Sequence, residues 1–488
     1  MPRRARARPS MSAAASHAAA AILIVVLCSS RLAAARVEPS HGGALATKRR
    51  DNVPAGACAL TAIPFGYPCE EHTVTTDDGY ILSLQRIPRG RHAGAGAVGS
   101  GLGQPVLLQH GVLVDGMTWL LGTPEESLAY ILADRGFDVW VANTRGTRWS
   151  SRHVSLDTSS REYWDWSWDD LVVKDMPNMV DYVSTHTAQK PHFLGHSMGT
   201  LVALASLSEG RLVDKLKSAA LLTPVAYLEH MTTPIGILLA KAFVGEIISV
   251  LGVAEFNPLS SAVSKLIREL CRHPGTKCYD LVRDFTGNNY CLNNSAVDVF
   301  LQYEPQPTST KTMIHLAQTF RDGVVSKYDY VWPNVNMEKY GQPDPPSYNM
   351  SNIPATFPLF LSYGGRDELA DPADVGLLLR DLMAHDRSRI TVQYLEEFAH
   401  LDFVLGTCAK DRVYGDLWIY SLRSKIDVSD IYFRTEGVRD LCWNMWGNAE
   451  TTATHVKCKH NCTEIMSTKG KILFTSTDSC TVLEYCIS

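Results

Sequence analysis

The sequence lacks a large excess of charge of either sign. Its 488 residues include 46 Lys and Arg against 51 Asp and Glu, which gives a formal net charge of −5 at pH 7. Proteins that bind nucleic acid usually carry a strongly basic surface that neutralises the phosphates, so no nucleic-acid partner is expected. The apolar share of 45% and the charged share of 20% are ordinary values and indicate a large globular protein.

The sequence also lacks an apolar run long enough to predict a transmembrane anchor. A spanning helix needs about 20 consecutive apolar residues. The run over residues 13–28 is short and diluted by alanine, and a second run over residues 234–251 is interrupted by Lys241 and Glu246. Neither run therefore predicts a membrane-spanning helix.

The first of these runs is typical of a secretory signal peptide. Four arginines lie within residues 1–8, and Ala33-Ala34-Ala35 supplies a small-residue cleavage site. A basic, an apolar and a small-residue segment in this order predict cleavage after Ala35, with a signal anchor as the alternative. We expect residues 1–35 to be removed, residues 36–57 to form a loose leader, and the protein to be secreted or delivered to a vacuole or lysosome.

Cysteine usage agrees with this route. Of the 12 cysteines, Cys28 leaves with the signal peptide, so an odd number remains and at least one thiol stays free. The segment Cys458-x-His460-x-Cys462 has a weak likeness to a metal site, but disulfide pairing explains it better in an oxidising compartment. No metal and no cofactor are expected. Three Asn-x-Ser/Thr sequons predict glycosylation, at Asn293, Asn349 and Asn461.

The most informative segment is Gly195-His196-Ser197-Met198-Gly199. The apolar run that ends at Leu194 predicts a strand, and the apolar residues from Thr200 onward predict a helix. A sharp turn between a strand and a helix, with a glycine on each side, leaves the serine hydroxyl exposed as a nucleophile. An ordinary turn serine is the alternative, because the pentapeptide also occurs by chance. We predict that Ser197 is the nucleophile.

An acid and a base follow later strands. Their order along the chain is nucleophile, acid and histidine, as in enzymes whose nucleophilic serine lies on a turn of this kind. Asp367 follows a predicted strand over residues 358–363, and His400 follows another over residues 391–395. A serine hydroxyl needs an imidazole to take its proton and a carboxylate to orient that imidazole. We therefore predict a triad of Ser197, Asp367 and His400.

The acid has competitors in the same segments. They are Glu368, Asp371, Asp374 and Asp402. Asp371 precedes Pro372, and an aspartate before proline is typical of a helix N-cap. Asp402 is too close to His400 in sequence to reach behind its ring. Asp367 lies nearest the end of the strand and is therefore preferred.

An oxyanion forms when a serine attacks a carbonyl carbon, and it needs two backbone N–H donors, one after the nucleophile and one on the loop after an earlier strand. A buried strand pattern over residues 105–109 runs into His110-Gly111-Val112. We predict that the N–H groups of Met198 and Val112 are these donors. His110 is interpreted as a packing residue.

His400 also has an alternative interpretation, as a loop histidine that packs between Phe398 and Phe403 and takes no part in catalysis.

These segments resemble the gastric and lysosomal acid lipase family. The motifs that carry the resemblance are Gly66–His72, Thr76–Leu82, Leu108–Gly111, Asn143–Gly146, Gly195–Thr200, Gly364–Pro372 and His400–Phe403. The likeness covers about residues 58–420. Met198 stands where the animal enzymes usually have glutamine and is similar to the plant triacylglycerol lipase branch. The resemblance implies that Ser197, Asp367 and His400 are nucleophile, acid and base, and that triacylglycerols or sterol esters are the substrates.

The order of apolar runs predicts the fold. Strand-like runs lie at residues 106–109, 138–142, 191–194, 219–222, 358–363 and 391–395 and alternate with helical stretches. This pattern is typical of a mostly parallel sheet with helices on both faces. We predict an α/β-hydrolase fold with a core over residues 58–222 and 355–420 and an inserted helical cap or lid over residues 223–354. Residues 421–488 form a Cys-rich tail whose structure the sequence leaves open.

Two segments have a structural and a functional interpretation. The apolar start of the cap, residues 234–251, predicts either packing among cap helices or a lid that covers Ser197 and meets lipid when open. The Trp-rich residues 163–170 suggest a sugar platform or a packed lead-in to a helix. We favour the lead-in, because Met176, Met179, Val180 and Val183 recur at helical spacing just afterwards.

Three functions from different classes fit these observations. The favoured one is a lipase that acts on neutral lipids at a lipid–water interface through an acyl-enzyme. A carboxylesterase for soluble short-chain esters is the second, and the apolar cap argues against it. A non-catalytic hydrolase-fold protein that binds lipid is the third, and the presence of Ser197, Asp367 and His400 argues against it.

Overall fold

The computed structural model describes residues 56–92, 103–241, 243–250, 252–258, 282–283 and 285–415, and the short segments 467–468, 471–474 and 483–486. The predicted signal peptide, nearly all of the leader, Asn461 and the Cys458–Cys462 segment lie outside these residues. The chain divides into two compact units, Met1–Tyr414 and Gly415–Ser488. In the second unit, β12 (Ser467–Thr468), β13 (Lys471–Phe474) and β14 (Leu483–Cys486) form an antiparallel sheet.

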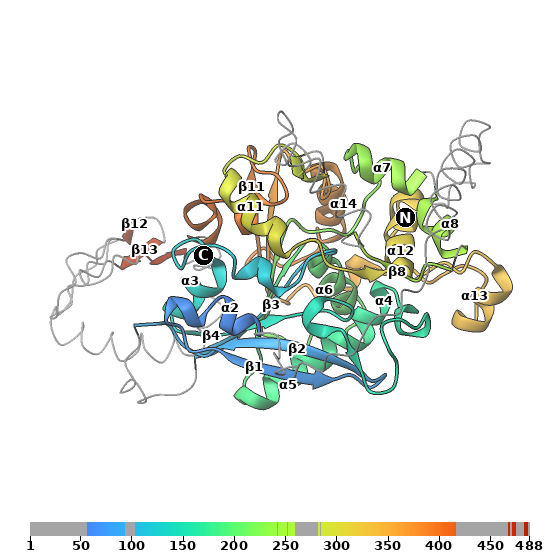
Figure 1. The fold of residues 1–488 in the computed structure, drawn as a ribbon. Coiled ribbons are helices and arrows are strands. Elements are labelled where there is room, and N and C mark those ends of the chain that lie inside the picture. The colour runs from blue at the N-terminus through green and yellow to red at the C-terminus, as the bar shows by residue number, and fades with distance from the viewer. Residues whose placement is uncertain are drawn as a thin grey trace, which may run out of the picture. The chain divides into compact units, whose positions relative to one another are not determined.

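In the described part of the first unit, nine strands form one sheet (Figure 1). In their order across the sheet they are β1 (Glu70–Thr75), β2 (Tyr80–Ile87), β4 (Phe137–Ala142), β3 (Gln104–Gln109), β6 (His192–His196), β7 (Ser218–Leu222), β10 (Leu359–Gly364) and β11 (Ile390–Leu395), with β5 (Arg152–His153) paired to β2. The pairs from β4 to β11 are parallel. The pairs that involve β2 are antiparallel. The predicted mostly parallel sheet is confirmed, and an antiparallel edge is added to it.

Helices cover both faces of this sheet. Strands β4, β6 and β7 are buried at every residue, which requires cover on the two faces toward which alternate side chains point. The covering elements of the core are α2 (Ala57–Leu60), α3 (Leu128–Asp134), α4 (Trp168–Asp170), the π-helical turn η5 (Leu171–Asp175), α5 (Met176–Thr187), α6 (Met198–Ser208), α14 (Pro372–Asp381) and α15 (Asp402–Leu405). Helix α5 packs against β1 and β3, α3 against β4, and α6 against β6.

A helical insertion separates β7 from β10 (Figure 1). Its described elements are α7 (Pro234–Lys241), α8 (Val244–Val250), β8 (Glu255–Phe256), α11 (Asn294–Tyr303), β9 (Thr308–Ser309), α12 (Thr310–Asp322) and α13 (Pro333–Tyr340). Helix α12 packs against α7 and α8, and β8 pairs with β9. The predicted inserted helical cap is therefore confirmed. Within the part of the chain that the structure describes, no helix combines the length and the apolar character needed to cross a membrane.

The Trp-rich segment is a packed lead-in to a helix, as predicted. Ser167 begins α4 with a capping box, in which its hydroxyl accepts the Asp169 N–H while the Asp170 carboxylate accepts the Ser167 N–H. The indole rings of Trp166 and Trp168 are 2% and 0% exposed, so they offer no platform to a sugar. The predicted apolar face of the helix that follows is buried at each of its positions.

A buried arginine ties the loop after β4 to two distant segments. The Arg145 side chain is 1% exposed, and its guanidinium donates to the carboxylates of Asp175 and Asp78 at 2.7 Å each. The guanidinium carbon also lies 3.9 Å from the centre of the Tyr80 ring. A buried charge is tolerated only when it is paired and hydrogen-bonded, and both carboxylates meet this need. The ion pairs hold the loop after β4 against η5 and the β1–β2 hairpin.

Two disulfides lie in the described part of the first unit. Cys58 pairs with Cys69, and Cys291 pairs with Cys408. The first closes a short segment before β1. The second joins the insertion to the segment that follows α15, across a sequence separation of 117 residues. It therefore connects the cap to the part of the core that contains the predicted catalytic histidine.

Candidate active site

Ser197 occupies a strained turn between β6 and α6. Its backbone dihedrals are φ 56° and ψ −126°, a combination that non-glycine residues rarely adopt. The Ser197 N–H donates to the Leu222 carbonyl, and the Ser197 carbonyl accepts the hydroxyl of Thr200 at 2.6 Å. The backbone on both sides of the turn is therefore held. The arrangement is the strand–turn–helix elbow that the pentapeptide predicted.

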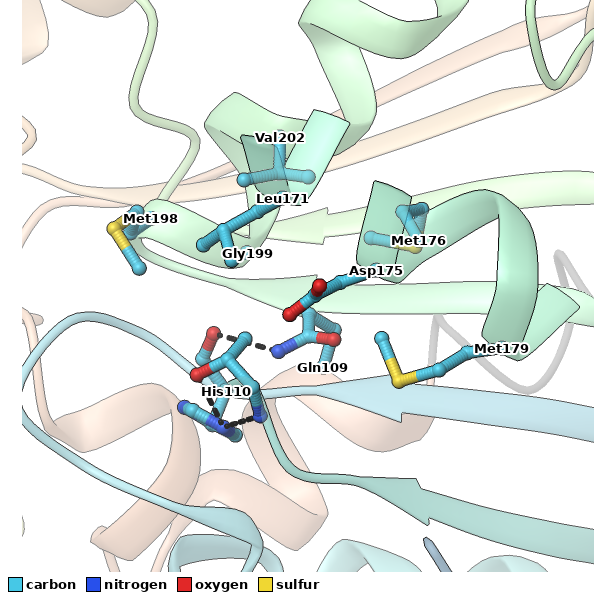
Figure 2. Close-up of a pocket in the computed structure, with 10 residues that line it drawn as sticks. Gln109, His110, Leu171, Asp175, Met176, Met179, Met198, Gly199 and Val202 are labelled. Carbon is cyan, nitrogen blue, oxygen red and sulfur yellow. Dashed lines mark hydrogen bonds between the residues drawn. The ribbon is translucent and has the colours of Figure 1, made fainter. Parts of the chain in front are cut away.

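The two glycines of the pentapeptide are required by close backbone contacts. A Cβ atom at Gly199 would lie 2.7 Å from the Gln109 carbonyl oxygen and 2.8 Å from that of His110. One at Gly195 would lie 3.0 Å from the carbonyl carbon of Gly199. Figure 2 shows Gly199 together with Gln109 and His110 among the residues that line a small space. This space is too narrow to admit a water molecule. This packing brings the start of α6 close to the end of β3 and leaves no room for a ligand beneath the turn.

The loop after β3 passes directly beside the Ser197 side chain. A Cβ atom at Gly111 would lie 2.8 Å from Ser197 Cβ and 3.2 Å from its Oγ. Val112 follows Gly111, and Met198 follows Ser197, so both predicted oxyanion donors adjoin this contact. Among the described residues, no acceptor takes the Val112 N–H. A free backbone donor beside a serine hydroxyl is what an oxyanion hole requires.

Asp367 and His400 meet on the loops after β10 and β11. Nδ1 of His400 lies 3.0 Å and 2.9 Å from the two Asp367 carboxylate oxygens. The two strands are parallel neighbours, so their carboxyl ends lie at one edge of the sheet. Asp367 Oδ1 also accepts the N–H groups of Leu369 and Ala370, and the carboxylate is 2% exposed. The carboxylate is thus fixed behind the imidazole.

His196 connects the serine turn to the histidine loop. Its Nε2–H donates to the His400 carbonyl at 3.0 Å, and the two imidazole rings lie 4.8 Å apart. Burial, which disfavours the charged ring, lowers the His196 pKa to about 3, so this imidazole is neutral. The structure contains no hydrogen bond between Ser197 and His400. Such bonds are often long in free enzymes and shorten when substrate binds.

Comparison with known proteins identifies the family. Residues 104–405 match the alpha/beta hydrolase fold family, and residues 59–123 match the partial alpha/beta-hydrolase lipase region. Triacylglycerol lipase 2 of Arabidopsis thaliana is 55% identical over 362 residues, which cover 74% of this chain and 86% of that protein. The chain belongs to the lipase family of α/β-hydrolases. Triacylglycerol lipase 1 of the same plant is 40% identical, with coverage of 76% and 91%, and human gastric triacylglycerol lipase is 34% identical, with coverage of 72% and 87%.

In this α/β-hydrolase, two of the carboxylates that compete with Asp367 have other partners. Asp371 Oδ1 accepts the Ala373 N–H and caps α14, which confirms the predicted cap. Asp374 accepts both the backbone N–H and the Nδ1–H of His230. Neither carboxylate bonds to the imidazole of His400. The geometry therefore favours Asp367 as the acid.

His110 is a packing residue, as interpreted from the sequence. Its Nδ1–H donates to the Gly111 carbonyl at 2.8 Å, and its Nε2 accepts the Thr144 N–H at 3.1 Å. Burial lowers the His110 pKa to about 4, so the ring stays neutral and both nitrogens are occupied. It links the loop after β3 to the loop after β4 and is not available as a base.

The structural role of Asp402 was not predicted from the sequence. This carboxylate is 0% exposed and accepts three backbone N–H groups, from Ala399, Tyr290 and Cys291. Nearby, the Asn289 side chain accepts the Leu401 N–H. These bonds hold the loop of His400 against the cap segment that contains Cys291. No local sequence pattern predicts contacts between residues that are more than 100 positions apart in the chain.

Replacing Asp402 with alanine is expected to destabilise this lipase by about 3 kcal/mol. The change leaves three N–H donors without their charged acceptor, and the loss costs about 1–3 kcal/mol for a buried donor such as that of Ala399 and less for the half-buried and exposed ones. Urea unfolding measures the effect. Asp411, which is exposed, serves as the control, and its replacement with alanine should change the free energy of unfolding by less than about 0.5 kcal/mol. Equal effects of the two substitutions would contradict this account.

Two of the predicted glycosylation sites are exposed. Asn293 caps α11 by accepting the Ala296 N–H, and Asn349 accepts the Ser351 N–H. Both bonds use the side-chain oxygen, whereas a glycan attaches to the nitrogen. Each amide nitrogen lies on an exposed residue, as modification requires. Glycosylation itself stays a prediction.

Proposed function

We propose that this protein is a secreted or vacuolar lipase that hydrolyses triacylglycerols through an acyl-enzyme on Ser197. The observation that carries the proposal is the Asp367–His400 pair, with Nδ1 2.9 Å from the carboxylate, next to a strained serine elbow in a chain of the lipase family. The printed names of the relatives supply the substrate class.

The first half of the reaction acylates the serine. His400 Nε2 takes the Ser197 proton while Oγ attacks the ester carbonyl carbon. The resulting oxyanion is held by the N–H groups of Val112 and Met198. Asp367 accepts from Nδ1–H and stabilises the imidazolium that forms. The tetrahedral intermediate then collapses, the bond to the alcohol oxygen breaks, and the imidazolium gives its proton to the leaving glyceride.

The second half releases the fatty acid. His400 takes a proton from water, and the hydroxide attacks the acyl-enzyme carbonyl at the same oxyanion site. Collapse of this intermediate breaks the bond to Ser197 Oγ, which recovers a proton from the imidazolium. One ester and one water become one acid and one alcohol, and no cofactor takes part.

Exposed apolar side chains on the cap support a lipid substrate. Val250, Val331 and Trp332 are 88%, 52% and 68% exposed, and all three lie in the insertion between β7 and β10. Contiguous exposed apolar surface, rather than single side chains, marks contact with lipid or another protein, and Val331 and Trp332 are adjacent in the chain. Tryptophan in particular favours the boundary between water and lipid. These side chains therefore favour an emulsified lipid over a dissolved ester as the substrate.

The proposal also places the protein in the secretory pathway. The basic and apolar N-terminus is typical of a signal peptide, and the disulfides Cys58–Cys69 and Cys291–Cys408 suit an oxidising compartment. Microscopy of the full-length chain with a C-terminal tag tests this proposal. Accumulation in the cytosol would contradict it.

A comparison of substrates tests the proposed specificity. We expect faster turnover of emulsified long-chain triacylglycerols than of soluble butyrate esters, measured as acid released per enzyme at equal ester concentration. Sterol ester emulsions form a third arm, which reports whether the enzyme accepts a different leaving alcohol. A clear preference for the soluble ester would replace the lipase with a carboxylesterase.

A further inference from the structure

Two carboxyl side chains meet inside the protein where the cap crosses the loop after β3. Asp115 caps the short helix η2 (Gly116–Trp119) and is 0% exposed. Glu304 follows the last residue of α11 and is 1% exposed. Asp115 lies three residues after Val112, the proposed oxyanion donor. The pair therefore stands between the cap and the catalytic loop, outside the triad.

Several hydrogen bonds tie the two segments together. The Asp115 N–H donates to Glu304 Oε1 at 3.1 Å, and the Gln306 N–H donates to the Leu113 carbonyl at 2.7 Å. Asp115 Oδ1 accepts the Met117 N–H. Leu113 has a φ of 60°, a backbone conformation that is costly for leucine and persists only where neighbours enforce it. The cap segment thus holds the loop of Val112 in a strained shape.

The two carboxyl groups have one oxygen each to spare. They belong to one contact, because the Asp115 N–H donates to Glu304 Oε1. Asp115 Oδ2 and Glu304 Oε2 are buried, and neither accepts a hydrogen bond from the described residues. Two neighbouring carboxyl groups that are both buried cannot both ionise without a large penalty, and a single proton shared by the pair relieves it.

One cation faces the pair. Nε of Arg148 lies 3.5 Å from Asp115 Oδ2, and the guanidinium also donates to the Tyr303 carbonyl. Among the described residues, Arg148 is the cation that forms an ion pair with either carboxyl group. One arginine balances at most one carboxylate, so two ionised carboxyl groups here would leave one buried negative charge without a partner. Burial and the neighbouring Asp115 raise the pKa of Glu304 well above its ordinary value, and burial raises that of Asp115.

We propose that Asp115 and Glu304 share one proton and act as positioning residues, which hold the Val112 N–H at the oxyanion site through the cap. This inference rests on the proposed function, because it assumes that Val112 binds the oxyanion. Neither side chain touches the substrate. The pair makes the shape of the oxyanion loop depend on contact with the cap and on pH.

The direction of the pH dependence follows from the raised pKa of Glu304. A carboxyl group whose folded-state pKa is raised stabilises the protein fully below its unfolded pKa, and this contribution is lost as the pH rises through the folded pKa. At acid pH the shared proton joins the cap to the loop. At alkaline pH two negative charges face each other in a buried space, and the contact weakens. Turnover should therefore decline on the alkaline side.

Substitutions of Glu304 test the proposal. Glu304→Gln keeps the oxygen that accepts the Asp115 N–H and supplies an amide donor that does not titrate. Glu304→Ala removes both and leaves Asp115 without its partner. We expect Glu304→Ala to lower kcat by about 100-fold with little change in KM, the loss typical of one misplaced oxyanion donor. Glu304→Gln should restore kcat and extend activity to higher pH than the wild type. Glu338→Gln, an exposed change on α13, is the matched control.

A second measurement separates this inference from the proposed function. Melting temperatures over the same pH range should fall with rising pH in the wild type and stay flatter in Glu304→Gln. If the wild type hydrolyses esters but folded Glu304→Ala keeps its kcat, or the Gln and wild-type profiles coincide, the positioning role is wrong and the lipase stands. If the wild type hydrolyses no ester, the proposed function fails, and with it the positioning role. The melting curves then decide whether the pair shares a proton.

Discussion

Ser197→Ala is expected to lower the turnover of triacylglycerol and of soluble esters by about 10⁶-fold, as loss of the nucleophile does in comparable triads. The alanine keeps the backbone of the elbow and removes only the oxygen that attacks the carbonyl carbon. His400 and Asp367 then have no hydroxyl to activate. The remaining rate comes from substrate binding and from oxyanion stabilisation by backbone N–H groups. Steady-state rates at saturating substrate measure the effect.

The control for this variant is Ser155→Ala, which removes an exposed hydroxyl that lies outside the turn of Ser197. Its turnover and melting temperature should equal those of the wild type within error. Labelling with an alkyl phosphonate adds a test that needs no substrate, because the reagent bonds covalently to an activated serine. The wild type should take up one phosphonate per chain and Ser197→Ala none. A folded wild type that stays unlabelled would support the non-catalytic alternative instead.

Much of the core was predictable because its strands are buried on both faces. Such strands appear in the sequence as short continuous apolar runs, and five of the six predicted runs overlap β3, β4, β6, β7 and β10. The sixth overlaps β11, a half-buried strand at the end of the sheet, whose β-branched and aromatic residues favour a strand. The edge strand β1 and its neighbour β2 were not predicted. Strand β1 is exposed or half-buried at every residue, so it has no apolar run to reveal it. Its place in the sheet depends on pairing with β2.

The candidate triad was predictable because each member follows a strand end. In a parallel sheet these ends share one edge, so short local motifs at distant positions converge. The supporting contacts were not predictable in this way. Asp115 and Glu304 lie 189 residues apart, and Asp402 and Tyr290 lie 112 apart. These pairs depend on how the cap packs on the core, and no local pattern encodes that packing.

Asp367→Asn is expected to lower turnover by about 10⁴-fold with the fold intact, if Asp367 rather than Asp371 is the acid of the triad. Asp367 Oδ1 accepts the N–H groups of Leu369 and Ala370, and an asparagine oxygen retains both bonds. The amide nitrogen then faces Nδ1 of His400 and donates to it. Nδ1 must become an acceptor, so the ring carries its proton on Nε2. An imidazole in that tautomer cannot take the serine proton.

Asp371→Asn provides the matched comparison, since it makes the same chemical change four residues along the same loop. Asp371 caps α14 by accepting the Ala373 N–H, and asparagine caps helices as well as aspartate does. We expect its stability to change by at most about 1 kcal/mol and its turnover to stay at the wild-type level. Turnover numbers and melting temperatures of the two variants decide the assignment. If Asp371→Asn loses orders of magnitude in turnover while Asp367→Asn stays active, then Asp371 is the acid, and the carboxylate seen behind His400 has a structural role.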